Sequence, residues 1–280
     1  MSAATAVSRA EAYYDSPDAD EFYYRVWGGE DIHVGIYESP EEPIATASRR
    51  TVERMIGRLS GLKESARILD IGSGYGGSAR HIVNSTPHTV VCLNLSKVQN
   101  ERNRAMNQEQ GLSKCIEVVD GNFEDLPFEP SSFDAVWSQD AILHSADRMR
   151  VIHQVARILR PGGDFVFTDP MQADTADPQS LQPVLERIHL DSLGSFAFYR
   201  QAAAQVDWKE VLIEDLSEQL TMHYTRVRAE LEKRDQELSS FCSRGYRERM
   251  KIGLGHWIEA GRRHDLSWGI LHFQKKAASA

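Results

Sequence analysis

The chain has 280 residues, of which 41% are hydrophobic and 26% charged, so it can bury a large core as one domain, or as one domain with an insertion. Its 41 acidic and 32 basic residues leave a formal net charge of -9, which argues against nucleic acid or an anionic membrane as a partner. The cysteines lie far apart without a CxxC pair, which indicates a reducing compartment and no metal site. Because there is no apolar leader and no run of about 18 apolar residues, we expect a soluble cytoplasmic protein.

The first 60 residues differ from the rest of the chain. Residues 9–41 are rich in aromatic side chains, glycine and acids, and a helix with a proline near its start is expected over 43–59. Farther along, strands alternate with helices, which predicts a parallel sheet with right-handed crossovers. The expected strands cover 67–71, 89–94, 116–119, 133–137 and 164–168, and the expected helices cover 75–85, 97–110 and 146–159.

The pattern changes after residue 170. A polar, aspartate-rich segment over about 171–195 contains one expected helix, 183–190, and interrupts the alternation. The remaining expected elements are helices over 196–205, 222–241 and 244–262 and strands over 211–215 and 268–273. The helix over 244–262 has no long apolar stripe, so we expect it at the surface.

A glycine-rich turn joins the first expected strand to the next helix. Gly72, Gly74 and Gly77 fit the pattern GxGxxG, in which small residues let the backbone approach a ligand at a helix N-terminus. The glycines alone suit a dinucleotide, S-adenosylmethionine, or a tight turn without a ligand. Asp70 favours S-adenosylmethionine, because a carboxylate repels a pyrophosphate and attracts the ammonium and sulfonium groups of that cofactor.

Three stretches together carry a family resemblance. They are Leu69–Gly74, Leu126–Asp134 with its Leu-Pro-Phe and Ser-Phe-Asp sequences, and Leu159–Gly163. As a set they resemble the landmarks of class I methyltransferases over about residues 60–170. The resemblance implies an α/β, Rossmann-like seven-stranded sheet whose last strand is antiparallel, with an N-terminal helical and aromatic lid and an insertion after strand five.

The same resemblance implies S-adenosyl-L-methionine as cofactor and S-adenosyl-L-homocysteine as product. The cofactor-binding residues that it implies are His33, Gly35, Asp70, Gly72, Gly74, Asn94, Leu95, Asn122, Phe123 and Gln139. Asn94 stands where the family usually has Asp or Glu. An amide still hydrogen-bonds a ribose diol as donor and acceptor, whereas an Asn at a strand end can also serve only as a helix cap.

A closer resemblance is to methyltransferases that act on small amines. Trp27–Tyr37 and Trp137–Ser145 resemble such enzymes, including those for phosphoethanolamine, and nearly the whole chain is similar to the sarcosine/dimethylglycine N-methyltransferases of glycine betaine synthesis. This implies a monomer or homodimer that methylates dimethylglycine, and sarcosine, to glycine betaine. It also implies that residues 1–60 form a lid and a helix packed on a methyltransferase domain, 61–280, in which 171–195 caps the substrate.

Methyl transfer to an amine requires alignment and exclusion of water, and little acid–base chemistry when the amine binds neutral. Asp140 and His144 stand four residues apart, which places them on one face of a helical turn, and neutral His144 suits removal of an ammonium proton. We expect catalytic roles for these two residues and Tyr14. Aromatic rings would surround the methylated nitrogen, and Arg200, or Arg187 as second choice, would hold the carboxylate. The expected substrate-binding residues are Tyr23, Trp27, Met171, Tyr199, Arg200 and Tyr224.

Three other functions stay open on the sequence. One is methylation of another small acceptor, a phosphobase or a hydroxylated natural product, although 171–200 offers few cations for a phosphate. Another is a regulatory protein that binds the cofactor without turnover, which the intact glycine turn and His144 disfavour. The last is a nicotinamide-dependent oxidoreductase.

Overall fold

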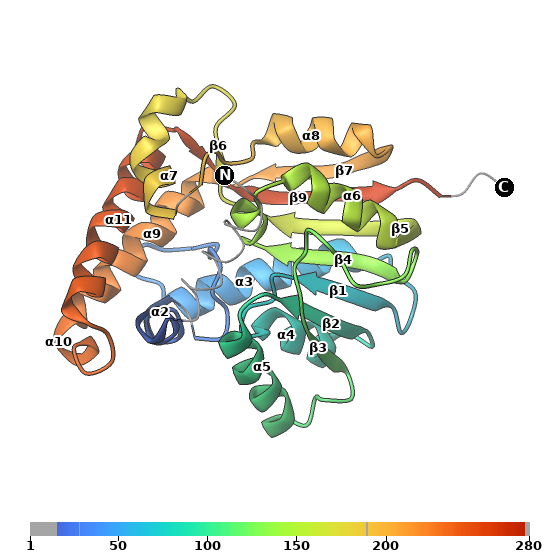
Figure 1. Ribbon diagram of the computed structural model, residues 1–280, viewed down its shortest axis with the longest axis horizontal. Coiled ribbons are helices and arrows are strands. Elements are labelled where there is room, and N and C mark those ends of the chain that lie inside the picture. The colour runs from blue at the N-terminus through green and yellow to red at the C-terminus, as the bar shows by residue number, and fades with distance from the viewer. Residues whose placement is uncertain (1–15, 28, 189, 278–280) are drawn as a thin grey trace.

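The computed structural model describes residues 16–27, 29–188 and 190–277. Its strands are β1 (Arg67–Ile71), β2 (Thr89–Asn94), β3 (Ile116–Asp120), β4 (Phe133–Gln139), β5 (Leu159–Thr168), β6 (Met171–Gln172), β7 (Trp208–Asp215), β8 (Leu266–Ser267) and β9 (Gly269–Lys275). Seven of them form one sheet in the order β3-β2-β1-β4-β5-β9-β7 (Figure 1). β1 to β5 are parallel to one another, and β9 lies antiparallel between β5 and β7. The expected α/β fold with an antiparallel last strand is confirmed.

Helices of several kinds connect these strands. The α-helices are α2 (Pro17–Phe22), α3 (Ile44–Ile56), α4 (Gly77–Ser85), α5 (Lys97–Glu109), α6 (Arg148–Ile158), α7 (Gln182–Ile188), α8 (Phe196–Gln205), α9 (Ser217–Lys233), α10 (Asp235–Leu238) and α11 (Arg244–Arg262). Shorter turns of helix are η1 (Tyr23–Trp27), η2 (Gly57–Leu59), η3 (Ile142–His144) and η4 (Pro178–Leu181). No helix among the described residues is long and apolar enough to cross a membrane.

The two faces of the sheet are covered by different helices. Successive side chains of a strand point to opposite faces, so neighbouring residues of β1 enter different cores. Ile68 belongs to a core that includes residues of α3, α4 and α9, whereas Leu69 belongs to a core that includes residues of α6 and α8. The continuous apolar runs of β1, β2 and β4 follow from this burial on both faces.

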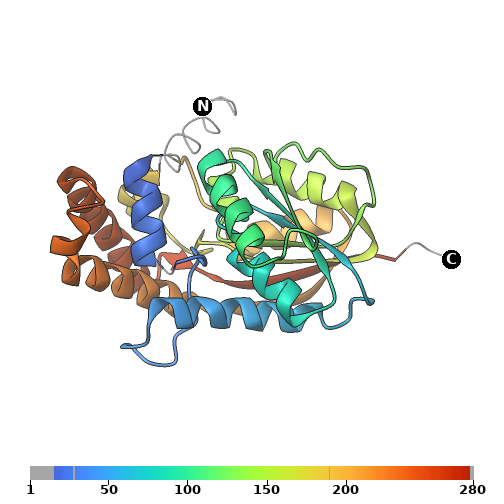
Figure 2. The same ribbon diagram turned by 90° about the horizontal axis from the view of Figure 1, so that it is seen from below.

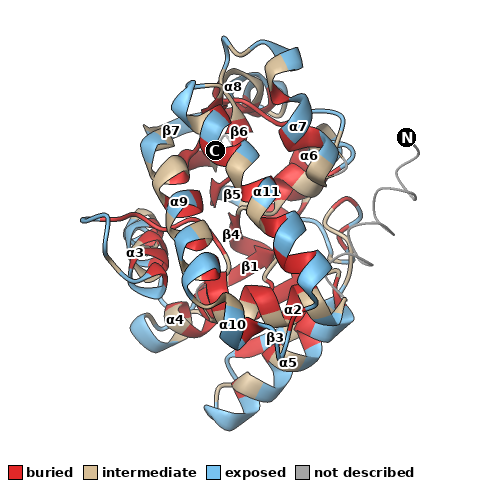
Figure 3. Cartoon of the chain, turned by 90° about the vertical axis from the view of Figure 1, so that its left-hand side faces the viewer, coloured by how far each residue is buried: buried red, intermediate tan, exposed pale blue. Residues whose placement is uncertain are grey.

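A further group of helices lies beyond the carboxyl ends of the parallel strands. Figures 1 and 2 both place α2, α9, α10 and α11 at this end of the molecule, opposite the C-terminus. Figure 3 shows α9 and α11 in front of the buried strand ends, with exposed residues on their outer side. The insertion contributes α7, which packs on α11, and β6, which pairs with β8. The N-terminal region, the insertion and the late helices therefore meet at one end of the sheet.

The structure corrects the prediction that the helix over 244–262 has no long apolar stripe. α11 packs against α9 and buries a face that includes Met250, Leu254 and Trp257. The stripe is hard to recognise in the sequence because Gly253 and Ala260 also belong to this face and add little hydrophobicity. The helix expected over 222–241 is instead two helices, α9 and α10, which meet at Arg234.

Candidate active site

The turn after β1 has the backbone that its glycines allow. Gly72 and Gly74 have positive φ angles of 74° and 52°, a region that disfavours side chains. A Cβ on Gly72 would lie 2.3 Å from the Cβ of Ala141, in the loop that follows β4. The glycines therefore allow a close approach between two loops and keep the carboxyl end of β1 clear of side chains.

Two pockets meet at this end of the sheet, and most of the expected cofactor-binding residues line them. Asn94, Leu95, Asn122 and Phe123 line the larger pocket, His33 and Asp70 line the smaller one, and Gly72, Gly74 and Gln139 line both. Gly35 lines neither pocket. It packs on α3 instead, where an added Cβ would lie 2.7 Å from the Cβ of Ala47.

Asp70 gives the smaller pocket a buried acid. Its side chain is 3% exposed and, within the described ranges, accepts no hydrogen bond. Burial raises the pKa of this carboxyl to about 7; His33 opposes the rise and Asp31 adds to it. A cation bound in the smaller pocket would compensate the carboxylate for its lost hydration. The site therefore fits the ammonium group of S-adenosylmethionine.

The larger pocket has polar groups that suit an adenosine. Nδ2 of the Asn94 side chain donates to Oε1 of Gln99 at 3.0 Å. This leaves Oδ1 of the same side chain as an acceptor for a ribose hydroxyl. Asn122 accepts the N–H of Glu124 at 2.9 Å, which fixes the loop that carries Phe123. Nε2 of Gln99 and Nε2 of Gln139 are buried without a hydrogen-bond partner. These residues fit the nucleoside part of the cofactor.

Asp140 joins the end of β4 to a segment from the N-terminal region. Its carboxylate accepts the N–H of Val34 at 2.6 Å and the indole N–H of Trp268 at 2.7 Å, while its own N–H donates to the carbonyl of Thr168 at 3.0 Å. Asp140 has a positive φ of 51°, which Asp tolerates better than most residues. Burial raises the pKa of its carboxyl, and these donors and His33 oppose the rise. The contacts are those of a residue that positions its neighbours.

Residues Ile32–Tyr37, here called the strap, cross from the cofactor pockets to α9. Thr51 of α3 donates to the carbonyl of Val34 at 2.9 Å. On α9, Nδ1 of His223 accepts both the N–H of Gly35 at 3.2 Å and the hydroxyl of Tyr37 at 2.9 Å. Ile32 lines both pockets and His33 lines the smaller one. The hydrogen bonds of the strap therefore link the walls of these pockets to α3 and α9.

His144 lies in η3 and lines the larger pocket together with Asp140, so the structure brings the two expected catalytic residues together. Burial, together with the positive charges of Arg148 and Arg187, lowers the pKa of His144 to about 4. Arg148 begins α6 and donates to the carbonyls of Leu143 at 3.0 Å and Ser192 at 2.5 Å. His144 is therefore a neutral imidazole beside two cations. Tyr14, the third expected catalytic residue, lies outside the described residues.

Three of the expected substrate-binding residues gather in one aromatic cluster. Trp27 of η1 lies 5.1 Å from Tyr23, 5.3 Å from His223 and 5.7 Å from Tyr224, measured between ring centroids. Tyr224 stacks on Trp257 of α11 at 4.8 Å. The cluster fixes η1 against α9 and α11, and its members are buried.

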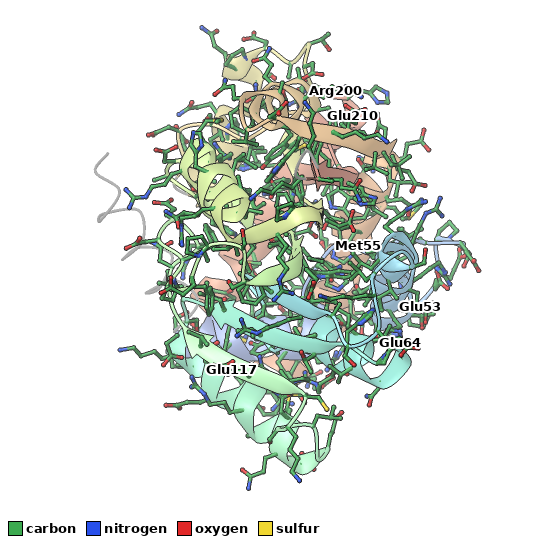
Figure 4. The ribbon with its side chains drawn as sticks, turned by 90° about the vertical axis from the view of Figure 1, so that its right-hand side faces the viewer. Glu53, Met55, Glu64, Glu117, Arg200 and Glu210 are labelled. Carbon is green, nitrogen blue, oxygen red and sulfur yellow. The ribbon has the colours of Figure 1, made fainter. Side chains whose placement is uncertain are left out.

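The other expected substrate-binding residues lie elsewhere. Met171 is fully buried in β6, and Tyr199 is fully buried with its hydroxyl donating to Asp169 at 2.6 Å. Asp169 also accepts the N–H of Leu143 at 2.8 Å, so the hydrogen bonds of Asp169 connect Tyr199 to η3. Arg200 is 50% exposed and pairs with Glu210 of β7 at 3.1 Å; Figure 4 shows both residues together at the α8 end of the molecule. Arg200 lines neither cofactor pocket.

The sequence argument missed several residues of the site. Ile32, Ser96, Gln99, Glu124 and Ala141 line the larger pocket, and Ser73 and Ser78 line the smaller one. Ser96 and Gln99 follow the second strand directly, and their place after a strand end was a usable signal. Arg148 carried no signal, because an arginine at the start of a helix is usually exposed.

Comparisons with known proteins agree with this architecture. Residues 69–167 match the family model described as "Methyltransferase domain". The solved structure of a chain described as a sarcosine dimethylglycine methyltransferase, from Galdieria sulphuraria, superposes with a TM-score of 0.90 at 44% identity and covers 95% of this chain and 100% of its own. A phosphoethanolamine N-methyltransferase 2 from Haemonchus contortus shares the fold with a TM-score of 0.82 at 17% identity, covering 95% of this chain and 60% of its own.

Curated relatives match over nearly the full length. A sarcosine/dimethylglycine N-methyltransferase from Aphanothece halophytica is 54% identical and covers 98% of this chain and 100% of its own. A dimethylglycine N-methyltransferase from Parasynechococcus marenigrum is 46% identical and covers 96% of each chain. With this identity over full length, with the class I fold and with a pocket at the glycine turn, the chain belongs to the sarcosine/dimethylglycine N-methyltransferase family of class I methyltransferases.

Proposed function

We propose that this enzyme transfers the methyl group of S-adenosylmethionine to the nitrogen of dimethylglycine, and of sarcosine, with glycine betaine as the final product. One observation carries the proposal: His144, kept neutral by burial and by the charges of Arg148 and Arg187, lines the pocket that adjoins the buried carboxyl of Asp70. The acid in the smaller pocket and the polar groups of the larger pocket match the ammonium group and the nucleoside of the cofactor. The positive charges of the two arginines match the carboxylate of a small amino acid. The names of the relatives support the same acceptors.

The chain's own residues supply the cofactor site. Asp70 would hold the ammonium group, Asn94 the ribose hydroxyls, and Asn122 and Phe123 the adenine. When bound there, the cofactor supplies an electrophilic methyl group on a sulfonium. Asp140 would hold the strap over this site, which positions the ligand and excludes water from it.

His144 and the aromatic cluster would serve the acceptor. A neutral imidazole accepts the proton of the acceptor's ammonium group and leaves its nitrogen free to attack. The cluster of Tyr23, Trp27 and Tyr224 would supply ring faces toward a methylated nitrogen, whose positive charge grows during the transfer. Segment 171–195, which carries α7, would cap the acceptor from the side of α11.

The acceptor's carboxylate requires a cation, and Arg187 and Arg148 supply two beside His144. A guanidinium binds a carboxylate through two parallel hydrogen bonds and fixes its orientation. Arg200 is a poor alternative because it pairs with Glu210 at the surface, half exposed. We therefore assign the carboxylate to Arg187 and Arg148.

The direct test is methyl transfer from labelled S-adenosylmethionine by the purified protein to dimethylglycine, sarcosine, glycine or phosphoethanolamine, each offered alone. Label is expected in glycine betaine from the first two acceptors. Label confined to phosphobases, or calorimetric cofactor binding without turnover on any amine, would overturn the proposal.

The carboxylate assignment has its own test. Arg187→Ala should raise KM for dimethylglycine at least about tenfold, because a charge-assisted pair is lost, and should leave the dissociation constant of the cofactor unchanged. Arg200→Ala is the matched comparison and should change neither quantity. Equal effects of the two substitutions on KM would remove Arg187 from the site.

A further inference from the structure

The buried face of α11 contains a glycine in the interior of a long helix. α11 has 19 residues, and Gly253 lies near its middle. Glycine in such a position weakens a helix relative to alanine, since it has no side chain to restrict the unfolded chain. Its presence therefore calls for a reason in the packing.

The reason lies on α7. The side chain of Arg187 crosses α11 at Gly253, where an added Cβ would lie 1.9 Å from Nε and 2.0 Å from Cδ of the arginine. One turn earlier on the same helix, Sδ of Met250 lies 3.1 Å from Nη2 of Arg187. No side chain fits at position 253 while Arg187 keeps this path.

The charge of the Arg187 guanidinium is felt at the candidate acceptor site. Its positive charge acts on His144 together with that of Arg148, which reaches His144 from α6. Arg148 forms no ion pair with the described residues, and its Nε is buried without a hydrogen-bond partner. Two cations from separate elements thus act on one imidazole, and Arg187, the one from the insertion, crosses α11 at Gly253.

We propose that Gly253 is a positioning residue for the acceptor: the missing side chain leaves a passage across α11 that lets Arg187 extend to the acceptor's carboxylate. The inference rests on the proposed function, in which Arg187 and Arg148 hold that carboxylate. It assigns acceptor specificity partly to a residue that touches neither the acceptor nor the cofactor.

A Cβ at position 253 would meet a flexible side chain and not the backbone, so the fold can absorb the change by moving Arg187. Gly253→Ala should therefore leave the thermal midpoint of unfolding nearly unchanged, because the better helix propensity of alanine offsets part of the lost packing. The displaced guanidinium should raise KM for dimethylglycine at least about tenfold, with a smaller change in kcat and none in cofactor affinity.

Gly255→Ala is the matched control on the same helix. An added Cβ there would meet only Nη1 of Arg228, at 3.2 Å, which is the far end of a half-exposed side chain. This variant should keep the KM of the unchanged enzyme. The two variants should also differ in selectivity: Gly253→Ala should lose preference for dimethylglycine over 2-dimethylaminoethanol, which has no carboxylate, and Gly255→Ala should retain it.

A double variant separates this inference from the proposed function. If Gly253 acts through Arg187, Gly253→Ala should have no further effect on KM once Arg187→Ala is present. A high KM in Arg187→Ala with an unchanged KM in Gly253→Ala would overturn the inference and leave the carboxylate assignment standing. An unchanged KM in Arg187→Ala would overturn both. Additive effects of the two substitutions, or a loss of cofactor affinity in Gly253→Ala, would show that position 253 supports the fold generally.

Discussion

Burial and two neighbouring cations set the charge of His144. Burial disfavours the imidazolium, and the guanidinium groups of Arg148 and Arg187 disfavour it further. The same two cations suit an anionic group of the acceptor. In the proposed site, the two residues that would hold the carboxylate also help to keep His144 unprotonated at neutral pH before the acceptor binds.

This environment predicts the titration of His144. Because its pKa is lowered to about 4, its imidazole NMR signals should not move between pH 8 and pH 5.5 in the protein without acceptor. The signals are identified by their loss in His144→Gln. Arg187→Ala removes one positive neighbour and should raise the pKa of His144. A midpoint near the ordinary value of 6.5 in the unchanged protein would contradict the assigned environment.

The residues of the site differ in how well the sequence predicts them. Asp70 and the glycines lie within one local stretch, so their relation to each other is fixed by strand and turn geometry. The choice between Arg200 and Arg187 depends on which helix packs on which. Arg200 faces Glu210 of its neighbouring strand, and Arg187 follows a path across a helix about 65 residues later in the chain. The residues next to Arg187 in the sequence do not indicate that its side chain crosses α11.

The strap, Ile32–Tyr37, has no regular secondary structure, and side chains of two helices form hydrogen bonds with its backbone. Its backbone bonds to α3 through Ser48 and Thr51 and to α9 through His223 and Gln219. Residues at its start line the two pockets at the glycine turn, so the shape of these pockets and the packing of α9 are linked. Sequence periodicity does not reveal such a segment, because its partners lie on helices far away in the chain.

Gly35 tests the strap as an element. An added Cβ would lie 2.7 Å from both C and Cβ of Ala47 and 2.8 Å from the nitrogen of Ser48, so the strap or α3 must move. Gly35→Ala should lower the free energy of unfolding by about 2 kcal/mol or more and weaken cofactor binding, since Ile32 and His33 shift with the strap. Gly57→Ala, at the end of α3 with nothing within 4 Å, should be neutral or stabilising. Urea unfolding and calorimetry measure both effects, and equal destabilisation by the two substitutions would contradict this account.

At the scale of the whole molecule, the order of strands and helices was predictable and the arrangement around the strand ends was not. Alternation of strands and helices dictates a parallel sheet, and a parallel sheet brings its carboxyl ends to one edge. The helices that close this edge come from the two ends of the chain and from the insertion, as α2, α11 and α7 show. Their contacts are long-range, so the acceptor side of the site emerges only from tertiary packing.

Burial of Asp70 links the stability of the whole molecule to pH. Its pKa is about 7 in the folded protein and near the ordinary value of 3.8 in the unfolded chain, so folding takes up a proton between these pH values. The free energy of unfolding therefore falls as pH rises through this window, by up to about 1.4 kcal/mol per pH unit for one such group. The bound ammonium of the cofactor would remove this cost.

Asp70→Asn should remove this contribution to the pH dependence from the cofactor-free protein. The variant should gain stability relative to the unchanged protein between pH 5 and pH 8, and it should bind S-adenosylmethionine at least about tenfold more weakly, because the ammonium loses its counter-charge.

Asp134→Asn is the control, and its effect on stability should have the opposite sign. Lys63, Arg160 and the N–H of Arg67 lower the pKa of Asp134 despite its burial. That carboxylate stabilises the fold above its unfolded pKa, and its loss should cost stability at pH 7 that is not seen at low pH. Denaturant unfolding across this pH range measures both, and a pH profile of Asp70→Asn that parallels the unchanged protein would exclude Asp70 as the buried acid.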